Sequence, residues 1–330
     1  MLEHGGQLRT AAARYGIPLA DWLDLSTGIN PIPFAPPPVP PEAWSRLPEE
    51  QDGLEEAAAN YYGTQSILPV AGTQAAIQAL PRLRSSCRVG VPRPGYAEHA
   101  HAWRSAKHEV KELRADEIAA QVGNLDVLVL MQPNNPTGGL FASENLLYWH
   151  EELASRGGWL VVDEAFIEAS AAQSLIQATM PQGLIVLRSM GKFFGLAGAR
   201  AGFVAAHAAL LASLREVLGP WCVAGPARQA VRAALLDRAW QQAAKKRLRQ
   251  DGQRLVQLLR DADMPPAGGC GLFQWVQTER AEIIHQRLAQ CGILTRYFAE
   301  PSSLRFGLPC CETDWLRLAA ALDQETVCTP

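Results

Sequence analysis

Short, unbroken apolar runs alternate with helical patterns from about residue 54 onward. The runs are RVGV at 88–91, VLVLM at 127–131, WLVVD at 159–163, LIVLRS at 184–189 and GFVAA at 202–206. Strands that are apolar throughout are buried on both faces, and helices between them allow neighbouring strands to run parallel. The pattern predicts an α/β fold with a mostly parallel sheet and helices on both faces.

The pattern changes after Pro226, where a long helical stretch runs toward Asp261. Beyond it lie GLFQWVQ at 271–277, a helix near 280–291, GILTRYF at 292–298, SLRFGLP at 303–309 and a helix from about 314. This order predicts a smaller α+β domain. The proline-rich run at 31–41 cannot continue a helix or a central strand. We expect an N-terminal arm (1–45) joining the small domain, a large domain (46–215) and a small C-terminal domain (216–330).

The composition argues against several classes of protein. With 48% hydrophobic and 19% charged residues, the 330-residue chain is too apolar to be disordered. A net charge of −3 and the lack of a basic stripe argue against a nucleic-acid partner. No apolar run reaches the roughly 18 residues of a membrane span, and the seven cysteines lack metal-binding spacing. We expect a cytoplasmic protein with reduced thiols and neither a metal nor a membrane partner.

Polar residues follow several of the predicted strands. QPNNPTGG comes after 127–131, Asp163-Glu164 ends 159–163, and Ser189 and Lys192 follow 184–188. The turn AGTQAAIQAL at 71–80 leads into a helix whose first amides would point at an anion. Ligands of such sheets bind beyond the carboxyl ends of the strands. These side chains therefore predict one binding site at that edge.

The lysine in LRSMGKFFGLAGARAGF, at 187–203, stands among glycines and phenylalanines. Burial there would lower the pKa of Lys192 and make its amine a better nucleophile; the alternative is a loop lysine that reaches water. The segment is not a phosphate-binding P-loop, because Val186 replaces the first glycine and Phe193 follows the lysine. A Schiff-base lysine, a carboxylate and anion donors together describe a pyridoxal phosphate site.

The chain resembles the fold-type I, aspartate-aminotransferase-like (class I/II) family of pyridoxal phosphate enzymes. The matching motifs are NNPTG at 134–138, DEAF at 163–166 and SMGKFFGLAGARAG at 189–202, in the family's order. The resemblance covers nearly the whole chain. It implies a sheet of the seven-stranded type, pyridoxal 5'-phosphate as cofactor, and a homodimer with active sites near the interface.

The resemblance also implies roles for single residues. Lys192 would hold the cofactor, and Asp163 would pair with its pyridinium nitrogen. The residues expected to bind the cofactor are Gly72, Thr73, Gln74, Tyr96, Asn135, Asp163, Ser189, Lys192 and Arg200. The Asn135–Pro136 bond is a candidate cis peptide. Arg305 would clamp the substrate carboxylate with its bidentate fork, the alternative being a surface arginine at a strand edge.

Two residues depart from the family pattern. Phe166 stands where most aminotransferases of this group have a tyrosine that contacts the cofactor ring. Leu47, before Pro48, replaces the tyrosine that usually reaches the phosphate in the partner subunit. Both departures weigh against ordinary transamination and leave the cofactor assignment intact.

Two groups within the family are nearest in pattern: histidinol-phosphate aminotransferases and the threonine-phosphate decarboxylases of cobalamin synthesis. HGG at 4–6, DLSTGINP at 24–31 and DEAF in place of DEAY favour the decarboxylases. That resemblance implies conversion of L-threonine O-3-phosphate to (R)-1-aminopropan-2-ol O-2-phosphate and carbon dioxide. The residues expected at the substrate are His4, Gly5, Gly6, Asn30, Asn135, Arg296 and Arg305. An aminotransferase stays the alternative; a non-catalytic relative is disfavoured because Lys192, Asp163 and Arg305 are intact.

Overall fold

The computed structural model describes residues 4–170, 173–179 and 181–327. The backbone divides into two compact units. The small unit comprises the residues up to 32, residues 136–139 and those from 243 onward; the large unit comprises 33–135 and 140–242. The domain boundaries expected after residues 45 and 215 stay a prediction, because a compact unit of the backbone need not be an independently folding domain.

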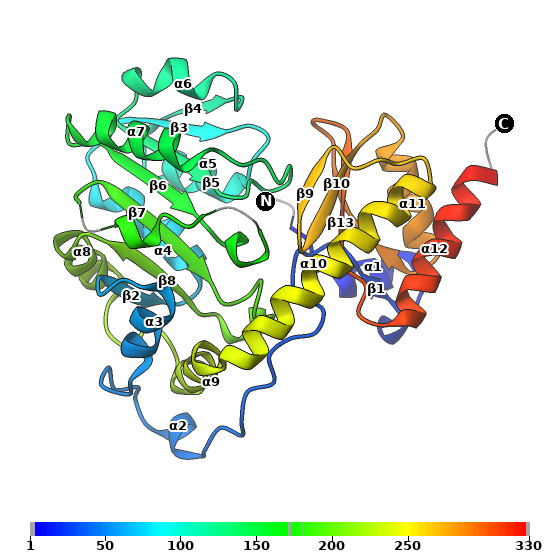
Figure 1. The fold of residues 1–330 in the computed structure, drawn as a ribbon, viewed down its shortest axis with the longest axis horizontal. Helices are drawn as coiled ribbons and strands as arrows, with labels where there is room; N and C mark the ends of the chain where they lie inside the picture. The colour runs from blue at the N-terminus through cyan, green and yellow to red at the C-terminus, as the bar shows by residue number, and fades with distance from the viewer. Residues whose placement is uncertain (1–3, 171–172, 180, 328–330) are drawn as a thin grey trace. The chain divides into compact units, whose positions relative to one another are not determined.

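The large unit is built around a seven-stranded sheet with the order β2-β8-β7-β6-β5-β3-β4 (Figure 1). Its strands are β2 (Ile67–Val70), β3 (Arg88–Pro92), β4 (Glu109–Leu113), β5 (Val127–Met131), β6 (Trp159–Asp163), β7 (Leu184–Ser189) and β8 (Gly202–Ala206). β8 runs in the opposite direction to the other six strands of this sheet, which are all parallel to one another. The predicted mostly parallel sheet is confirmed, and all five apolar runs form strands.

The large unit contains helices as well as the sheet. They are α2 (Glu42–Ser45), α3 (Leu54–Tyr62), α4 (Thr73–Ala79), α5 (Ala97–Ser105), α6 (Ile118–Gln121), α7 (Ser143–Ala154), α8 (Ala208–Leu218) and α9 (Gly225–Leu236). Ile77 of α4, Trp103 of α5 and Leu214 of α8 share a core cluster with alternate residues of the strands. Leu128 and Leu160 point to the opposite side of the sheet and are also fully buried, so both faces are covered.

The small unit contains an antiparallel sheet with the order β12-β13-β10-β9. Its elements are α1 (Leu8–Tyr15), β1 (Leu23–Asp24), β9 (Gly268–Cys270), β10 (Phe273–Gln277), α11 (Ala281–Gln290), β11 (Ile293–Leu294), β12 (Arg296–Phe298), β13 (Ser303–Gly307) and α12 (Glu312–Val327). β1 pairs in parallel with β11, and Ala11, Trp22 and Ala289 form a small apolar core. The α+β pattern predicted for this region is confirmed.

The helical stretch expected from Pro226 to Asp261 is two helices rather than one. α9 ends at Leu236 and α10 (Arg238–Asp261) begins two residues later. Asp237 between them is not helical (φ −82°, ψ 82°), and its Oδ1 accepts a hydrogen bond of 2.9 Å from the Trp240 amide. Asp237 thus caps the start of α10. None of the helices in the described ranges has both the length and the apolar character of a membrane span.

Candidate active site

The carboxyl ends of β5, β6 and β7 lie at one edge of the large sheet. Met131 pairs with Asp163, and Asp163 pairs with Leu187. Gly202, where β8 begins, pairs with both Ser189 and Val70. The segment before β8 and the turn before α4 therefore belong to the same edge. The sheet brings together expected cofactor residues that the sequence places on separate strands.

Asp163 is buried and held by two donors. The Ala165 amide donates to Oδ1 at 3.0 Å, and His99 Nε2 lies 3.0 Å from Oδ2. His99, on α5, is itself only 2% exposed. These two contacts fix the direction of the carboxylate. Sequence reasoning missed His99. The one sequence signal for it was its position three residues after Tyr96, an expected cofactor residue. The ring centres of Tyr96 and His99 lie 6.0 Å apart in an edge-to-face arrangement.

Lys192 follows β7 on a loop that two buried rings anchor. Phe193 and Phe194 are fully buried, and both pack against Trp240. Lys192 itself is half-buried, with Nζ 5.2 Å from the centre of the Phe166 ring. The amine thus faces the apolar ring of Phe166, at the position where the family resemblance led us to expect a tyrosine.

An anion cradle forms where the turn before α4 meets the segment before β8. A Cβ atom added to Gly72 (φ 74°) would lie 2.8 Å from Arg200 Nη2, and one added to Gly202 would lie 3.0 Å from the Thr73 amide nitrogen. Arg200 adopts a left-handed conformation (φ 48°), which is uncommon outside glycine. Guanidinium, backbone amides and the Ser189 hydroxyl are donors suited to a phosphate. The structure brings these expected phosphate ligands together.

Gln74, Tyr96 and Asn135 border this cradle and the strand ends. The Tyr96 hydroxyl lies 3.4 Å from Gln74 Oε1, and Gln74 Nε2 donates to Glu98 at 2.7 Å. Asn135 is half-buried just beyond β5. The cis peptide bonds of the described residues are Arg93–Pro94, Gln132–Pro133 and Glu300–Pro301, so the expectation of a cis bond at Asn135–Pro136 is wrong.

A cluster of buried charged side chains lies where β6 and β7 end. Arg188, the neighbour of Ser189, donates to Glu164 at 3.0 Å and to Glu168 at 2.5 Å. Burial raises the pKa of Glu164 in spite of the nearby guanidinium. Burial alone would lower the pKa of Arg188, but the two carboxylates raise it. Losing Arg188 would leave both carboxylates buried without compensation, so the cluster ties the end of β6 to β7.

The expected carboxylate ligand lies in the small unit. Arg305 is 7% exposed on the inner strand β13, which excludes the alternative of a surface arginine at a strand edge. Its Nη2 donates to the Ser26 carbonyl at 2.8 Å. Arg296 is its register partner on β12, so the two side chains leave the same face of the sheet.

Of the remaining expected substrate residues, Asn135 belongs to the large unit, and His4, Gly5, Gly6 and Asn30 belong to the small unit. Asn30 is buried, and its Oδ1 accepts from the Ile32 amide at 3.0 Å and from Arg247 at 3.2 Å. His4 is exposed. The Gly6 amide, expected to donate to an anion, donates to Ser26 Oγ at 2.7 Å.

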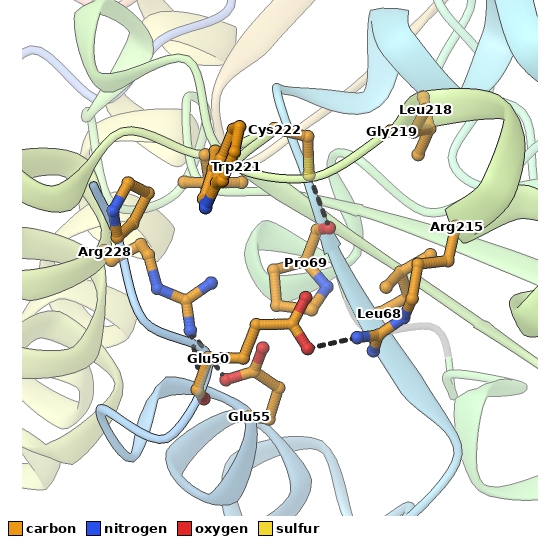
Figure 2. A pocket seen from close by; sticks show the side chains of 12 residues that line it. Glu50, Glu55, Leu68, Pro69, Arg215, Leu218, Gly219, Trp221, Cys222 and Arg228 are labelled. Carbon is orange, nitrogen blue, oxygen red and sulfur yellow. Dashed lines mark hydrogen bonds and ion pairs between the residues drawn. The ribbon is translucent and has the colours of Figure 1, made fainter.

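A pocket elsewhere on the large unit has none of the expected cofactor ligands (Figure 2). Arg228 pairs with Glu55 at 2.8 Å, Arg215 pairs with Glu50, and the Cys222 thiol donates to the Pro69 carbonyl. Its charges are thus largely compensated by one another. We therefore assign the candidate site to the edge of the sheet rather than to this pocket.

Comparisons with known proteins agree with the geometry. The model of the family described as aminotransferase class I and II matches residues 47–328. The chain is 56% identical to the threonine-phosphate decarboxylase of Pseudomonas aeruginosa over 98% of this chain and 97% of that protein. It is 44% identical to the threonine-phosphate decarboxylase of a Sinorhizobium species, over 97% of both chains.

A solved structure shows the same fold. Histidinol-phosphate aminotransferase from Sinorhizobium meliloti, in complex with pyridoxal-5'-phosphate, superposes with a TM-score of 0.82. The match covers 98% of this chain and 95% of that one, at 21% identity. At this identity the likeness establishes the fold and leaves the reaction to the chain's own residues.

Proposed function

Because the chain belongs to the aminotransferase class I and II family, we propose that it is a pyridoxal phosphate-dependent decarboxylase. Its reaction converts L-threonine O-3-phosphate into (R)-1-aminopropan-2-ol O-2-phosphate and carbon dioxide, a step of cobalamin biosynthesis. The observation that carries the proposal is the 56% identity, over nearly the whole chain, to a threonine-phosphate decarboxylase.

The residues at the sheet edge fit the cofactor. Arg200, Ser189 and the amide of Thr73 would bind its phosphate, where the close approach of Gly72 to Arg200 leaves no room for a side chain. Lys192 would bind its aldehyde covalently, and Asp163 would face its ring nitrogen. When bound, pyridoxal phosphate supplies an electron sink for the bond that breaks at the substrate Cα.

The protein's own side chains would fix the positions of the catalytic carboxylate and the cofactor ring. His99 keeps the Asp163 carboxylate in one direction, so its negative charge stays aimed at one point. Tyr96 would stack on the cofactor ring, and Asn135 would donate to its oxygen. Phe166 places no hydroxyl beside Lys192, which removes one group able to relay a proton there.

The arginines of the small unit suit a substrate with two anionic groups. Arg296 and Arg305 stand opposite one another on neighbouring strands. Arginine binds carboxylates and phosphates through paired hydrogen bonds, and threonine phosphate carries both groups. Histidinol phosphate carries a phosphate but no carboxylate. Arg305 would bind the carboxylate and Arg296 would contribute to the phosphate site.

The test is the fate of threonine phosphate. The purified protein, supplied with pyridoxal phosphate, should release carbon dioxide from threonine phosphate without any 2-oxo acid, because decarboxylation regenerates the cofactor in each turnover. Carbon dioxide and amino alcohol phosphate should appear in equal amounts. Turnover of histidinol phosphate with 2-oxoglutarate, and none of threonine phosphate, would establish the aminotransferase instead.

Gly72→Ala is expected to weaken cofactor binding by roughly 10-fold or more. The new methyl group would stand 2.8 Å from Arg200 Nη2 and push the guanidinium away, and alanine also tolerates φ 74° poorly. Titration of the apoprotein with pyridoxal phosphate measures the effect. Gly198→Ala is the matched control, because nothing lies within 4 Å of a Cβ atom at that position. Equal affinities in both variants would contradict the cradle.

We also propose a cytoplasmic homodimer. Trp44, Leu47 and Trp221 are large apolar side chains of the large unit with more than half of their surface exposed. Trp221 lines the pocket of Figure 2 together with Pro48. Exposed apolar groups of this size are typical of surfaces that bind another protein. A second copy of the chain is the partner that the family resemblance implies.

A further inference from the structure

Ser26 joins three segments of the small unit that are far apart in the sequence. Its amide and hydroxyl both donate to Asp24 Oδ1, at 2.9 Å and 2.6 Å. Its Oγ accepts from the Gly6 amide at 2.7 Å, and its carbonyl accepts from Arg305 Nη2 at 2.8 Å. Ser26 itself is 2% exposed, and its bond with Arg305 is buried, whereas its bonds with Gly6 and Asp24 are partly buried. One residue thus links the His4-Gly5-Gly6 segment to Arg305.

The direction of each bond is determined. Because Asp24 Oδ1 accepts from the Ser26 hydroxyl, the oxygen of that hydroxyl is left to accept from Gly6. Asp24 is held in turn by strand pairing with Leu294, and the Leu25 amide donates to the Leu294 carbonyl at 2.8 Å. The hydroxyl has one orientation that satisfies both of its partners.

Packing around Ser26 leaves no room for side chains. A Cβ atom on Gly5 would clash with the Ser26 carbonyl, and one on Gly307 would clash with the Thr27 carbonyl. Gly6 has φ 80°, which glycine adopts without strain. Gly5 and Gly6 therefore allow the N-terminal segment to pack against Ser26. His4 is the side chain that directly precedes these two glycines.

We propose that Ser26, oriented by Asp24, is a positioning residue that sets the preference for a phosphorylated substrate. Through Gly6 it holds His4, which we now place at the substrate phosphate together with Arg296, in a fixed relation to Arg305, which would bind the carboxylate. The proposal rests on the proposed function. Binding energy from the phosphate, which does not react, can orient the carboxylate only if the groups that bind the two anions are held rigidly.

Ser26→Ala distinguishes the contact of Ser26 with Gly6 from its contact with Arg305. It removes the hydroxyl that holds Gly6 but keeps the backbone carbonyl that accepts from Arg305. The variant should therefore disturb recognition of the phosphate and leave recognition of the carboxylate in place. A purely structural role would impair both equally.

The experiment compares two substrates on the holoenzyme. For Ser26→Ala, kcat/KM for threonine phosphate should fall by roughly 10- to 100-fold, whereas that for unphosphorylated threonine should change by less than about 2-fold. Inorganic phosphate should also inhibit threonine turnover less strongly in the variant. Ser302→Ala is the matched control, because the Ser302 hydroxyl likewise bonds a distant backbone group of the small unit, donating to the Thr278 carbonyl at 2.8 Å. Neither substrate should be affected by this change.

Other results would overturn the proposal. An equal loss for both substrates would mean that Ser26 is merely structural, and an unchanged ratio with unchanged phosphate inhibition would mean that it does not position His4. If Ser26→Ala does not fold, Asp24→Asn, which keeps an acceptor oxygen, should show the same change of ratio with smaller size. A wild-type enzyme inactive on threonine phosphate would instead refute the proposed function.

Discussion

Lys192→Ala is expected to abolish decarboxylation of threonine phosphate, with a loss of kcat on the order of 10⁴- to 10⁶-fold. Its amine is the group that would bind the cofactor covalently, and no other lysine follows a strand at this edge of the sheet in the described chain. Single losses of a covalent catalyst have effects of this size. The cofactor should still associate through the phosphate cradle, because Arg200 and Ser189 are untouched.

Reduction with borohydride tests directly for a covalent bond between Lys192 and the cofactor. Reduction of the wild-type protein loaded with pyridoxal phosphate should fix the cofactor to the peptide that contains Lys192, and the Lys192→Ala protein should lose the cofactor on dialysis. Lys245→Ala, at an exposed position of α10, is the control and should behave as wild type. Labelling at Lys245, or substantial activity without Lys192, would refute the assignment.

Asp163→Asn is expected to lower kcat by about 10²- to 10³-fold, equivalent to about 3–4 kcal/mol of transition-state stabilisation. The amide keeps the shape of the side chain and can still accept from the Ala165 amide, so folding and cofactor binding should persist. It lacks the negative charge that would keep the ring nitrogen protonated. The loss should therefore appear in kcat rather than in KM.

Two further variants sharpen this result. His99→Asn should give a smaller loss, because the carboxylate stays charged but loses the partner that fixes its direction. Asp116→Asn, in an exposed pair with Arg114, should have no effect on turnover. An Asp163→Asn enzyme with wild-type kcat would show that the carboxylate is not the partner of the ring.

The central strands of the large sheet were predictable from the sequence, and its two outermost strands were not. β5, β6 and β7 lie between other strands and are apolar up to their carboxyl ends, so each appears as an unbroken run. β2 and β4 are the edge strands of this sheet. β2 contains Pro69, which an edge strand tolerates, and β4 (EVKEL) is mostly polar. Burial on both faces produces the apolar run, and an edge strand lacks it.

The candidate site was predictable where its residues belong to local motifs. Lys192, Asp163, Ser189 and Arg200 each stand in a short motif at the end of a strand, and the structure brings them to one edge. His99 was missed because its role depends on α5 lying beside β6, and nothing in the local sequence records that contact. Which of these residues bind cofactor or substrate stays a prediction.

The N-terminal glycines show a different limit. Gly5 and Gly6 were expected to approach an anion, since glycine lets a backbone come close to a ligand. In the structure the close approach is to Ser26. A sequence indicates that a glycine is required for backbone contact, but it does not say whether the contact is with a ligand or with the protein. The structure shows the contact with the protein, and a contact of Gly5 and Gly6 with the substrate stays a prediction.

The left-handed backbone conformation of Arg200 lowers the stability of the protein at a position where function requires an arginine. A residue with a Cβ atom costs roughly 1–2 kcal/mol in this conformation, whereas glycine adopts it freely. Selection for thermal resistance alone would therefore favour glycine at position 200 and remove the guanidinium from the phosphate cradle. Engineering of a more heat-tolerant form should keep Arg200 unchanged and seek its gains at positions remote from the sheet edge.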